Sequence, residues 1–299
     1  MKKIVLSIII LIFLITGCTG VVPPLSVNNE IVHRALLIGI GDYFGSENDL
    51  PSPIYSVDRI RQIFSQCRFG LLDTEFSIIN ELKDSDATKE AILDEIASTF
   101  SDADNDDVSY FYYTGHGGRF LGISYLCPFY SNFPIFSIFS KISINKLEQA
   151  LSAIPGTKVV ILDTCHSGGF IGKGKEGVTI SEEELTSFND EIINVFSQSE
   201  SKGLLTTNQY KVLTSCHYNQ ECAEIIPIFG KPCGVFTMAL CTGCGYFNYD
   251  YPADSNGDTK VSLQEAYLYV KDWVQYYFSD LQQDVQVYPD NSTYSIIEY

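Results

Sequence analysis

Four side chains that can take part in hydrolytic chemistry stand almost side by side in the segment ILDTCHSGG, residues 161–169. They are the carboxylate of Asp163, the thiol of Cys165, the imidazole of His166 and the hydroxyl of Ser167. A thiol becomes a useful nucleophile near neutral pH once an imidazole is close enough to take its proton. Immediate neighbours at a strand end do not normally face one another, so His166 is badly placed to serve Cys165. Ser167 lacks the G-x-S-x-G turn of serine hydrolases.

Another glycine-rich turn supplies a better-placed base. The segment YYTGHGG, residues 112–118, ends a strand-like aromatic run and contains His116, 49 residues before Cys165. Cys165 likewise follows an apolar strand-like run, TKVVILD at 157–163. Parallel strands of an open α/β sheet end at the same edge, and such sheets bind ligands there. The two motifs therefore predict that Cys165 is a nucleophile and His116 its base, with glycine N–H groups nearby to hold an oxyanion.

Strands and helices must alternate along the chain to position these two motifs. Apolar runs that end in glycine or polar residues indicate buried strands, and apolar residues at helical spacing indicate the helices between them. This alternation is typical of a mostly parallel α/β sheet covered by helices on both faces. The strand-like runs are 34–41, 75–80, 108–114, 157–163 and 210–215, and the helical ones are 57–67, 87–100 and 234–243.

The motifs together resemble the caspase-like cysteine peptidases, most closely the bacterial and metacaspase branch. ALLIGIGDY near residue 40, YYTGHGG, ILDTCHSGG, VLTSC at 212–216 and GVFTMAL at 234–240 occur in that family's order. The resemblance implies an α/β caspase-like fold with a mostly parallel central sheet and helices on both faces. It implies one peptidase domain at 33–285 and a C-terminal tail at 286–299. Within the domain it implies a large-subunit-like part at 33–170, an inter-subunit segment at 171–208 and a small-subunit-like part at 209–285.

The same resemblance implies the role of each site residue. His116 would be the general acid and base, Cys165 the nucleophile, and the backbone N–H groups of Gly117 and Cys165 the oxyanion hole. In the metacaspase branch two carboxylates line the specificity pocket, and Asp163 and Asp58 are the matching positions here. Two acids favour Arg or Lys on the acyl side of the cleaved bond. We therefore expect a cysteine endopeptidase that cleaves protein or peptide substrates after basic residues.

Several alternatives stay open on the residues alone. Asp163 could be a strand-end carboxylate bonded to turn amides, and Asp58 an exposed acid in the first turn of a helix. The whole domain could be a catalytically silent binding or sensor module that has kept the fold. The polar segment 171–208 contains Lys173, Lys175 and Lys202, so we expect self-cleavage there. A helical cover for the sheet is the other interpretation of that segment.

The N-terminus has the form of an export signal. Two lysines precede an apolar run at 4–15, and LITGC at 14–18 resembles the lipobox of bacterial lipoproteins. The resemblance implies a signal peptide at 1–17, a lipid on Cys18 and a tether at 18–32. We expect an exported lipoprotein that contacts the membrane only through its lipid, on the extracytoplasmic side. A plain secretory signal and an uncleaved anchor are the alternatives.

The charge of the chain bears on its partners. It carries 19 Lys and Arg against 37 Asp and Glu, a formal net charge of −18. We find no basic patch, so nucleic acid is a poor candidate, whereas cationic peptides would be attracted.

No cofactor is required for the predicted chemistry, but DSNGDTKVSLQE at 254–265 resembles an EF-hand loop. Its candidate calcium ligands are Asp254, Asn256, Asp258, the carbonyl of Lys260, and Glu265. A solvated acidic turn that caps a helix is the alternative. Eight cysteines besides Cys18 could be buried thiols, disulfides or, less in keeping with their spacing, zinc ligands.

Overall fold

A computed structural model describes residues 30–43, 45–129, 139–166, 182–202, 209–217, 224–225, 231–279 and 283–299. The expected signal peptide and Cys18 lie outside these ranges. Residues Ile31–Tyr299 form one unit by their internal contacts. No helix in the part of the chain that is described is both long and apolar enough to cross a membrane.

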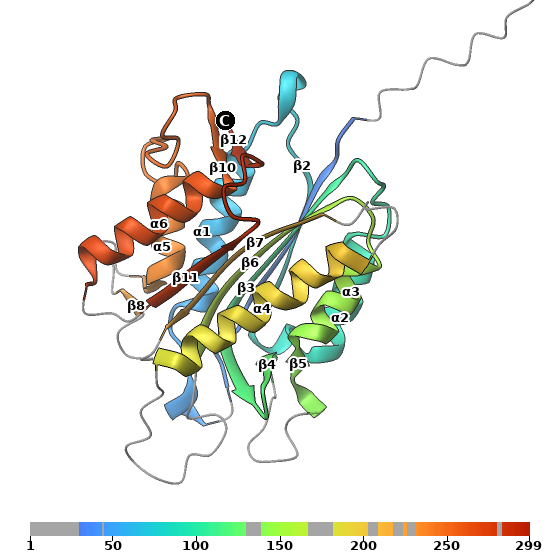
Figure 1. Ribbon diagram of the computed structural model, residues 1–299, viewed down its shortest axis with the longest axis vertical. Coiled ribbons are helices and arrows are strands. Elements are labelled where there is room, and N and C mark those ends of the chain that lie inside the picture. The colour runs from blue at the N-terminus through green and yellow to red at the C-terminus, as the bar shows by residue number, and fades with distance from the viewer. Residues whose placement is uncertain are drawn as a thin grey trace, which may run out of the picture. The chain divides into compact units, whose positions relative to one another are not determined.

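A mostly parallel sheet forms the centre of the domain (Figure 1). Its main strands lie in the order β11-β7-β6-β3-β1-β2, and of these only β11 runs antiparallel to its neighbour. Strand β1, which lies between β3 and the edge strand β2, is buried over its whole length, as the apolar run in its sequence predicts. The strands are β1 (His33–Gly39), β2 (Phe76–Lys83), β3 (Val108–Phe120), β6 (Thr157–His166), β7 (Gln209–His217) and β11 (Gln283–Tyr288).

Smaller strands extend or flank this sheet. The end of β3 continues past the parallel strands and pairs with β4 (Ile123–Leu126), which pairs in turn with β5 (Ile142–Ser143). Two further pairs are formed by β8 (Glu224–Ile225) with β9 (Cys233–Gly234), and by β10 (Lys260–Ser262) with β12 (Ser295–Glu298).

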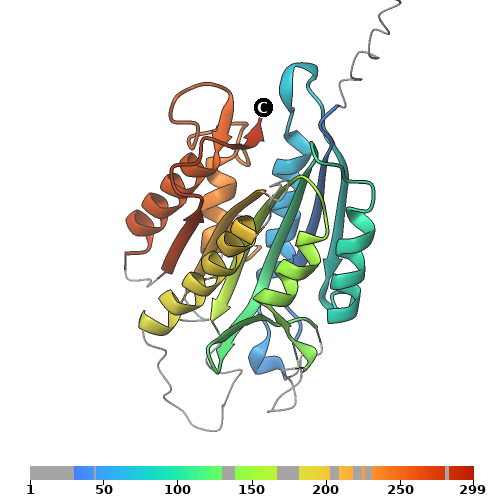
Figure 2. The same ribbon diagram turned by 45° about the vertical axis from the view of Figure 1, so that its right-hand side comes forward.

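Helices cover both faces of the sheet (Figure 2). On one face lie α2 (Lys89–Thr99), α3 (Ile144–Ser152) and α4 (Glu182–Lys202), and on the other lie α1 (Pro53–Gln66), α5 (Val235–Gly243) and α6 (Leu263–Tyr277). Successive side chains of a strand point to opposite faces, and β3 shows the result. Phe111 and Tyr113 join the core under α2–α4, whereas Tyr110 and Tyr112 join the core under α1, α5 and α6. This architecture confirms the fold class predicted from the sequence.

Side-chain caps begin three of these helices. Thr88, Ser143 and Ser262 accept hydrogen bonds from backbone N–H groups in the first turns of α2, α3 and α6. Helix α5 differs, because its N-cap residue is Gly234 and has no side chain to offer. The first turn of α5 therefore needs an acceptor from elsewhere in the fold.

The inter-subunit segment 171–208 is helical over its described part. Phe188, Ile192 and Phe196 recur at helical spacing in α4 and are fully buried against the sheet. Asn189, on the same face, donates to the main-chain carbonyl and the carboxylate of Asp284 at 2.9 Å each and accepts from Thr214 at 3.0 Å. The interpretation as a helical cover is thus confirmed for 182–202, while Lys173 and Lys175 lie outside the described residues.

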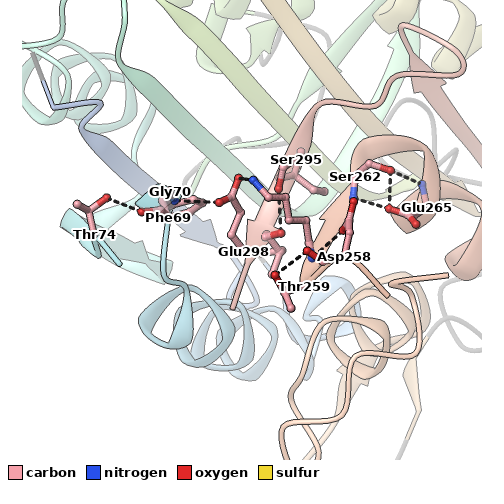
Figure 3. A network of polar contacts seen from close by, with 12 residues as sticks. Phe69, Gly70, Thr74, Asp258, Thr259, Ser262, Glu265, Ser295 and Glu298 are labelled. Atoms are coloured by element: carbon pink, nitrogen blue, oxygen red, sulfur yellow. Dashed lines mark hydrogen bonds and ion pairs between the residues drawn. The ribbon is translucent and has the colours of Figure 1, made fainter. Parts of the chain in front are cut away.

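The C-terminus contributes more to the fold than expected. Residues 286–299, anticipated as a tail, contain the end of β11 and all of β12. Strand β12 pairs with β10, and its Glu298 accepts hydrogen bonds from the N–H of Gly70 and from Lys260, at 2.9 Å each (Figure 3). These residues therefore belong to the folded unit, and the domain extends past the predicted boundary at 285.

Candidate active site

The two predicted catalytic positions lie opposite each other. Strands β3 and β6 pair in parallel with His116 in register with Cys165, and Gly117 in register with His166. His116 is completely buried. The side chains of Cys165 and His166 lie outside the described part of the structure. Parallel pairing at the strand ends has thus brought together residues that are far apart in the sequence, as the two glycine motifs predicted.

The orientation of the His116 ring follows from one contact. Its Nε2 atom lies 2.8 Å from the main-chain oxygen of Asn48, in the short helix η1 (Ser46–Asn48). A carbonyl oxygen can only accept, so Nε2 must carry the hydrogen. The neutral imidazole then has its lone pair on Nδ1, and Nδ1 is the atom able to take a proton from a thiol. No sequence pattern pointed to Asn48, because a backbone carbonyl can come from any residue.

Two buried tyrosines hold the main chain at His116. The Tyr43 hydroxyl accepts from the His116 N–H at 2.8 Å, and the Tyr113 hydroxyl donates to the His116 carbonyl at 2.8 Å. The Tyr43 ring also packs against the imidazole, with ring centroids 4.4 Å apart. Gly115 precedes His116 and has a φ of 152°, and a Cβ there would lie 2.7 Å from the Tyr43 hydroxyl. The predicted motifs contained both tyrosines, but their role depends on tertiary contacts.

Gly117 is closely surrounded. A Cβ atom there would lie 2.9 Å from Cζ of Phe188 in α4 and 3.2 Å from Cβ of Thr164. Any larger residue would force the buried Phe188 ring to shift, so packing alone is sufficient reason for glycine. The oxyanion role expected of the Gly117 and Cys165 N–H groups stays a prediction.

Asp163 is buried beside the first turn of α5. Its Oδ2 accepts from the Thr237 hydroxyl at 2.6 Å, and its carboxylate also accepts from the Thr237 backbone N–H. Thr237 is the third residue of α5, so Asp163 supplies the cap that Gly234 lacks. A Cβ on Gly234 would lie 2.6 Å from Oδ2. Burial raises the pKa of Asp163 to about 6, although the bonds from Thr237 act in the opposite direction.

Asp58 has different neighbours from Asp163. Its carboxylate pairs with Lys83 of β2 at 2.7 Å, and its side chain is 49% exposed. Ser56, two residues earlier in α1, is fully buried and faces the start of α5. Its hydroxyl accepts from the Gly234 N–H at 3.3 Å, so Ser56 contacts the residue that packs on Asp163. A substrate-binding role of Asp58 stays a prediction.

The 254–265 loop has part of the geometry expected for calcium. Asp254 accepts from the N–H groups of Gly257 at 2.7 Å and Thr259 at 3.0 Å, and Thr259 takes a positive φ of 67° where an EF-hand usually has glycine. Glu265 instead caps α6, accepting from the N–H and hydroxyl of Ser262 at 2.9 and 2.8 Å (Figure 3). The main chain of Lys260 donates to Asp258 at 3.0 Å.

The side chains of this loop are not arranged around a common point where a cation could bind. Among the described residues, no three His, Cys, Asp or Glu side chains are grouped so that they could hold a metal ion. Glu265 would have to leave its cap before it could join Asp254 on a cation. Calcium therefore stays a prediction.

The cysteines whose side chains are described are buried free thiols: Cys67, Cys127, Cys233, Cys241 and Cys244. Burial raises the pKa of Cys233 and of Cys244 to about 12. Thiols of this kind are inert at neutral pH, because their thiolate fraction is negligible. None of these five is therefore a rival to Cys165 as a nucleophile.

The comparison with known proteins places this geometry in a family. Residues 32–283 match the Caspase domain family, Peptidase C14, and the chain therefore belongs to it. Metacaspase-7 of Arabidopsis thaliana is 28% identical over 205 residues, which cover 65% of this chain and 50% of that protein. Metacaspase-9 of the same plant is 27% identical over 154 residues, which cover 48% of this chain and 46% of that protein. Metacaspase-1 of Candida albicans is 36% identical over 94 residues, which cover 29% of this chain and 19% of that protein.

The chain thus covers half or less of the length of these relatives. Among solved structures, protein GSU0716 from Geobacter sulfurreducens is similar with a TM-score of 0.51 at 14% identity. The match covers 86% of this chain and 93% of that one, and it supports the fold alone.

Proposed function

We propose that this protein is a cysteine endopeptidase with Cys165 as nucleophile and His116 as general base. The observation that carries the proposal is the pairing of these two positions at the ends of β3 and β6. The contact of His116 Nε2 with Asn48 supports it, because that contact leaves Nδ1 as the proton acceptor. Family membership supports a peptidase rather than another thiol chemistry.

In the proposed reaction, Nδ1 of His116 takes the thiol proton and the Cys165 sulfur attacks the carbonyl carbon of the scissile bond. The tetrahedral intermediate collapses, the C–N bond breaks, and His116 gives its proton to the leaving amine. A thioester is left on Cys165. His116 then takes a proton from water, whose oxygen attacks the thioester. The C–S bond breaks, the acid product leaves, and His116 returns the proton to the sulfur.

We propose a preference for Arg or Lys on the acyl side of the cleaved bond. Asp163 stands two residues before the nucleophile, and a carboxylate there would attract a guanidinium or ammonium group. The formal net charge of −18 favours the approach of basic peptides in general. Asp163 also caps α5, so the same carboxylate would serve both structure and specificity.

We propose further that the protein is an exported lipoprotein anchored through Cys18. This rests on the lipobox-like residues 14–18 and on the short apolar run before them. Labelling of expressing cells with a clickable fatty acid tests it, since wild type should carry the label and Cys18→Ala should not. Label in both forms would contradict the assignment of Cys18.

A panel of fluorogenic peptides tests the activity and its specificity together. The peptides differ only in the residue before the reporter, which is Arg, Lys, Asp or Leu. Wild type should hydrolyse the Arg and Lys peptides, and Cys165→Ala should hydrolyse none while keeping the wild-type melting temperature. Turnover of the Asp or Leu peptide in preference to the basic ones would overturn the specificity. No turnover of any peptide, with or without calcium, would favour the silent binding module.

A further inference from the structure

A buried chain of three polar groups runs from the middle of the sheet to Asp163. The Tyr112 hydroxyl lies 2.6 Å from Oγ1 of Thr237, and Thr237 donates to Oδ2 of Asp163 at 2.6 Å. Thr237 has one hydroxyl hydrogen and gives it to the carboxylate, so Tyr112 must donate to Thr237. Tyr112 and Thr237 are both fully buried, and Asp163 is 4% exposed. The chain thus ends on the carboxylate with every hydroxyl hydrogen directed toward it.

No other described group competes with Thr237 for control of this carboxylate. Among the residues that the structure describes, the titratable groups that interact with Asp163 are Tyr112 from β3, Cys233 from β9 and Cys241 from α5. Burial raises the pKa of each of the three, so all stay neutral at physiological pH. Arg59 of α1 interacts with the two cysteines, but its guanidinium is bonded to the main-chain carbonyls of Tyr55, Lys231 and Pro232.

We propose that Thr237 is a positioning residue for substrate recognition, which holds the Asp163 carboxylate in one orientation and favours its charged form. This rests on the proposed function, because it assumes that Asp163 selects basic side chains. A carboxylate that rotates or takes up a proton loses most of its attraction for a guanidinium. Hydroxyl and amide bonds from one helix turn oppose both changes. The bonds from Thr237 also lower the pKa of Asp163 against the larger effect of burial.

Gly234 completes the arrangement by letting α5 approach. Because a Cβ at 234 would come within 2.6 Å of Oδ2, a side chain there would push the helix end away from the carboxylate. The glycine that leaves α5 without its own cap is therefore also the residue that allows the short contact between Thr237 and Asp163. Gly234 itself is not a useful probe, since any substitution would disturb the start of α5.

The test uses the full-length protein and substitutions at Thr237. Thr237→Val keeps the shape but removes the hydroxyl, and it leaves the buried Tyr112 hydroxyl without an acceptor. The double variant Thr237→Val/Tyr112→Phe removes that second defect. Thr237→Ser restores the hydroxyl. Thr242→Val is the matched control, since Thr242 lies in the same helix and its hydroxyl bonds only to the main-chain carbonyl of Met238, at 2.7 Å.

Two readouts are measured between pH 4.5 and 8.5. One is kcat/KM for the Arg peptide, and the other is the pKa of the Asp163 carboxyl from ¹³C NMR. A hydrogen bond to a charged group is worth about a factor of ten or more, so the double variant should titrate about one pH unit higher. Because wild-type Asp163 is only half ionised at pH 6, the kcat/KM of the double variant at that pH should then fall about fivefold relative to wild type. Thr237→Ser and Thr242→Val should follow the wild-type profile.

An unchanged Asp163 titration in the double variant would overturn the inference. So would an equal shift in Thr242→Val, because that would be a general effect of altering α5. The NMR titration decides the matter even if no peptide is cleaved, and in that case the proposed peptidase activity fails separately. A shifted titration with an unchanged acid limb of kcat/KM would also overturn it, since Thr237 would then act on Asp163 without affecting recognition.

Discussion

Asp163→Asn should stabilise the folded protein above neutral pH while weakening its selection of basic substrates. Asp163 is buried with bonds from Thr237 but no ion-pair partner among the described residues, and burial raises its pKa from 3.8 to about 6. At 1.36 kcal/mol for each pKa unit, the charged form destabilises the folded state by about 3 kcal/mol. Asparagine has the same shape and carries no charge. Its amide offers only one oxygen to the two donors of Thr237, so we expect a net gain of about 1 to 3 kcal/mol.

The sign of the pH dependence follows from the direction of the shift. Well below pH 3.8 the group is protonated in both the folded and the unfolded chain, so it has no effect on the difference in their free energies. Between 3.8 and about 6 the unfolded chain ionises while folded Asp163 keeps its proton, and stability falls as pH rises. Above about pH 6 the loss is complete. Wild type and the Asp163→Asn variant should therefore converge in stability toward pH 4 and differ most at pH 8.

Urea unfolding at pH 4.5, 6 and 8 measures this difference. Asp107→Asn is the control, because Asp107 is equally buried but pairs with Arg34 at 2.7 Å and accepts from the N–H of Val32 at 2.9 Å. Removing that charge leaves Arg34 buried without its partner and should destabilise by about 3 kcal/mol. A destabilised Asp163→Asn at pH 8, or a gain that does not depend on pH, would refute the reasoning.

The other predictions concern the base, the cover helix, self-cleavage and calcium. His116→Ala should lower kcat/KM at least about a hundredfold and His166→Ala less than about tenfold, and equal losses would overturn the choice of base. Asn189→Leu should lower the free energy of unfolding by about 2 to 4 kcal/mol, because Thr214 and Asp284 lose their buried partner; an unchanged urea midpoint would contradict this. Self-cleavage should occur at the edges of α4 and not in its middle, since buried Phe188 and Ile192 hold the helix on the sheet. Mass spectrometry should find the fragments in wild type and not in Cys165→Ala. Identical fragments in both proteins would show that the cuts are not autocatalytic. If the 254–265 loop binds calcium, a chelator should lower the melting temperature by a few degrees, whereas no change together with no bound metal would remove calcium.

The pairing of His116 with Cys165 was predictable because it depends on topology alone. Each residue follows a strand-like run with a glycine-rich turn, and parallel neighbours end at the same edge of a sheet. The register then places the two positions opposite each other, and no side-chain detail is needed. The sequence pattern could not reveal the group that orients the His116 imidazole, because that group is the main-chain oxygen of Asn48 and any residue has one.

The orientation of Asp58 in α1 can be predicted from the helical periodicity of the sequence. The buried stripe of α1 includes Val57, Ile60 and Phe64, which follow one another at helical spacing. Ser56 lies on the edge of that stripe, whereas Asp58 is followed three and four residues later by Arg61 and Gln62. The periodicity already indicates that Asp58 faces away from the core. The contact with the start of α5 is therefore made by Ser56, while the substrate-binding role of Asp58 stays a prediction.

The role of Thr237 had no sequence signal, because a cap supplied by another strand leaves no local pattern. A helix that begins after glycine looks uncapped when it is read along the chain. Only the three-dimensional structure shows that the missing acceptor is Asp163, from β6. The two interpretations of Asp163, as a carboxylate bonded to amides and as an acid for substrate, are therefore compatible. The described contacts show the carboxylate bonded to Thr237, and the proposed function requires the same carboxylate to bind a basic side chain.

The proposed double role of Asp163, as cap of α5 and as acid for substrate, would explain why a buried carboxylate is kept despite its effect on stability. If Asp163 only capped α5, an uncharged acceptor such as asparagine would do so without the burial of a charge. If it only bound substrate, Thr237 and Gly234 would have no reason to enclose it so tightly. A charge held by the first turn of α5 joins β6, the strand of the proposed nucleophile, to the C-terminal half of the domain. Separation of the halves by cleavage would leave this contact intact only while α5 stays docked, so loss of docking and loss of basic specificity should occur together.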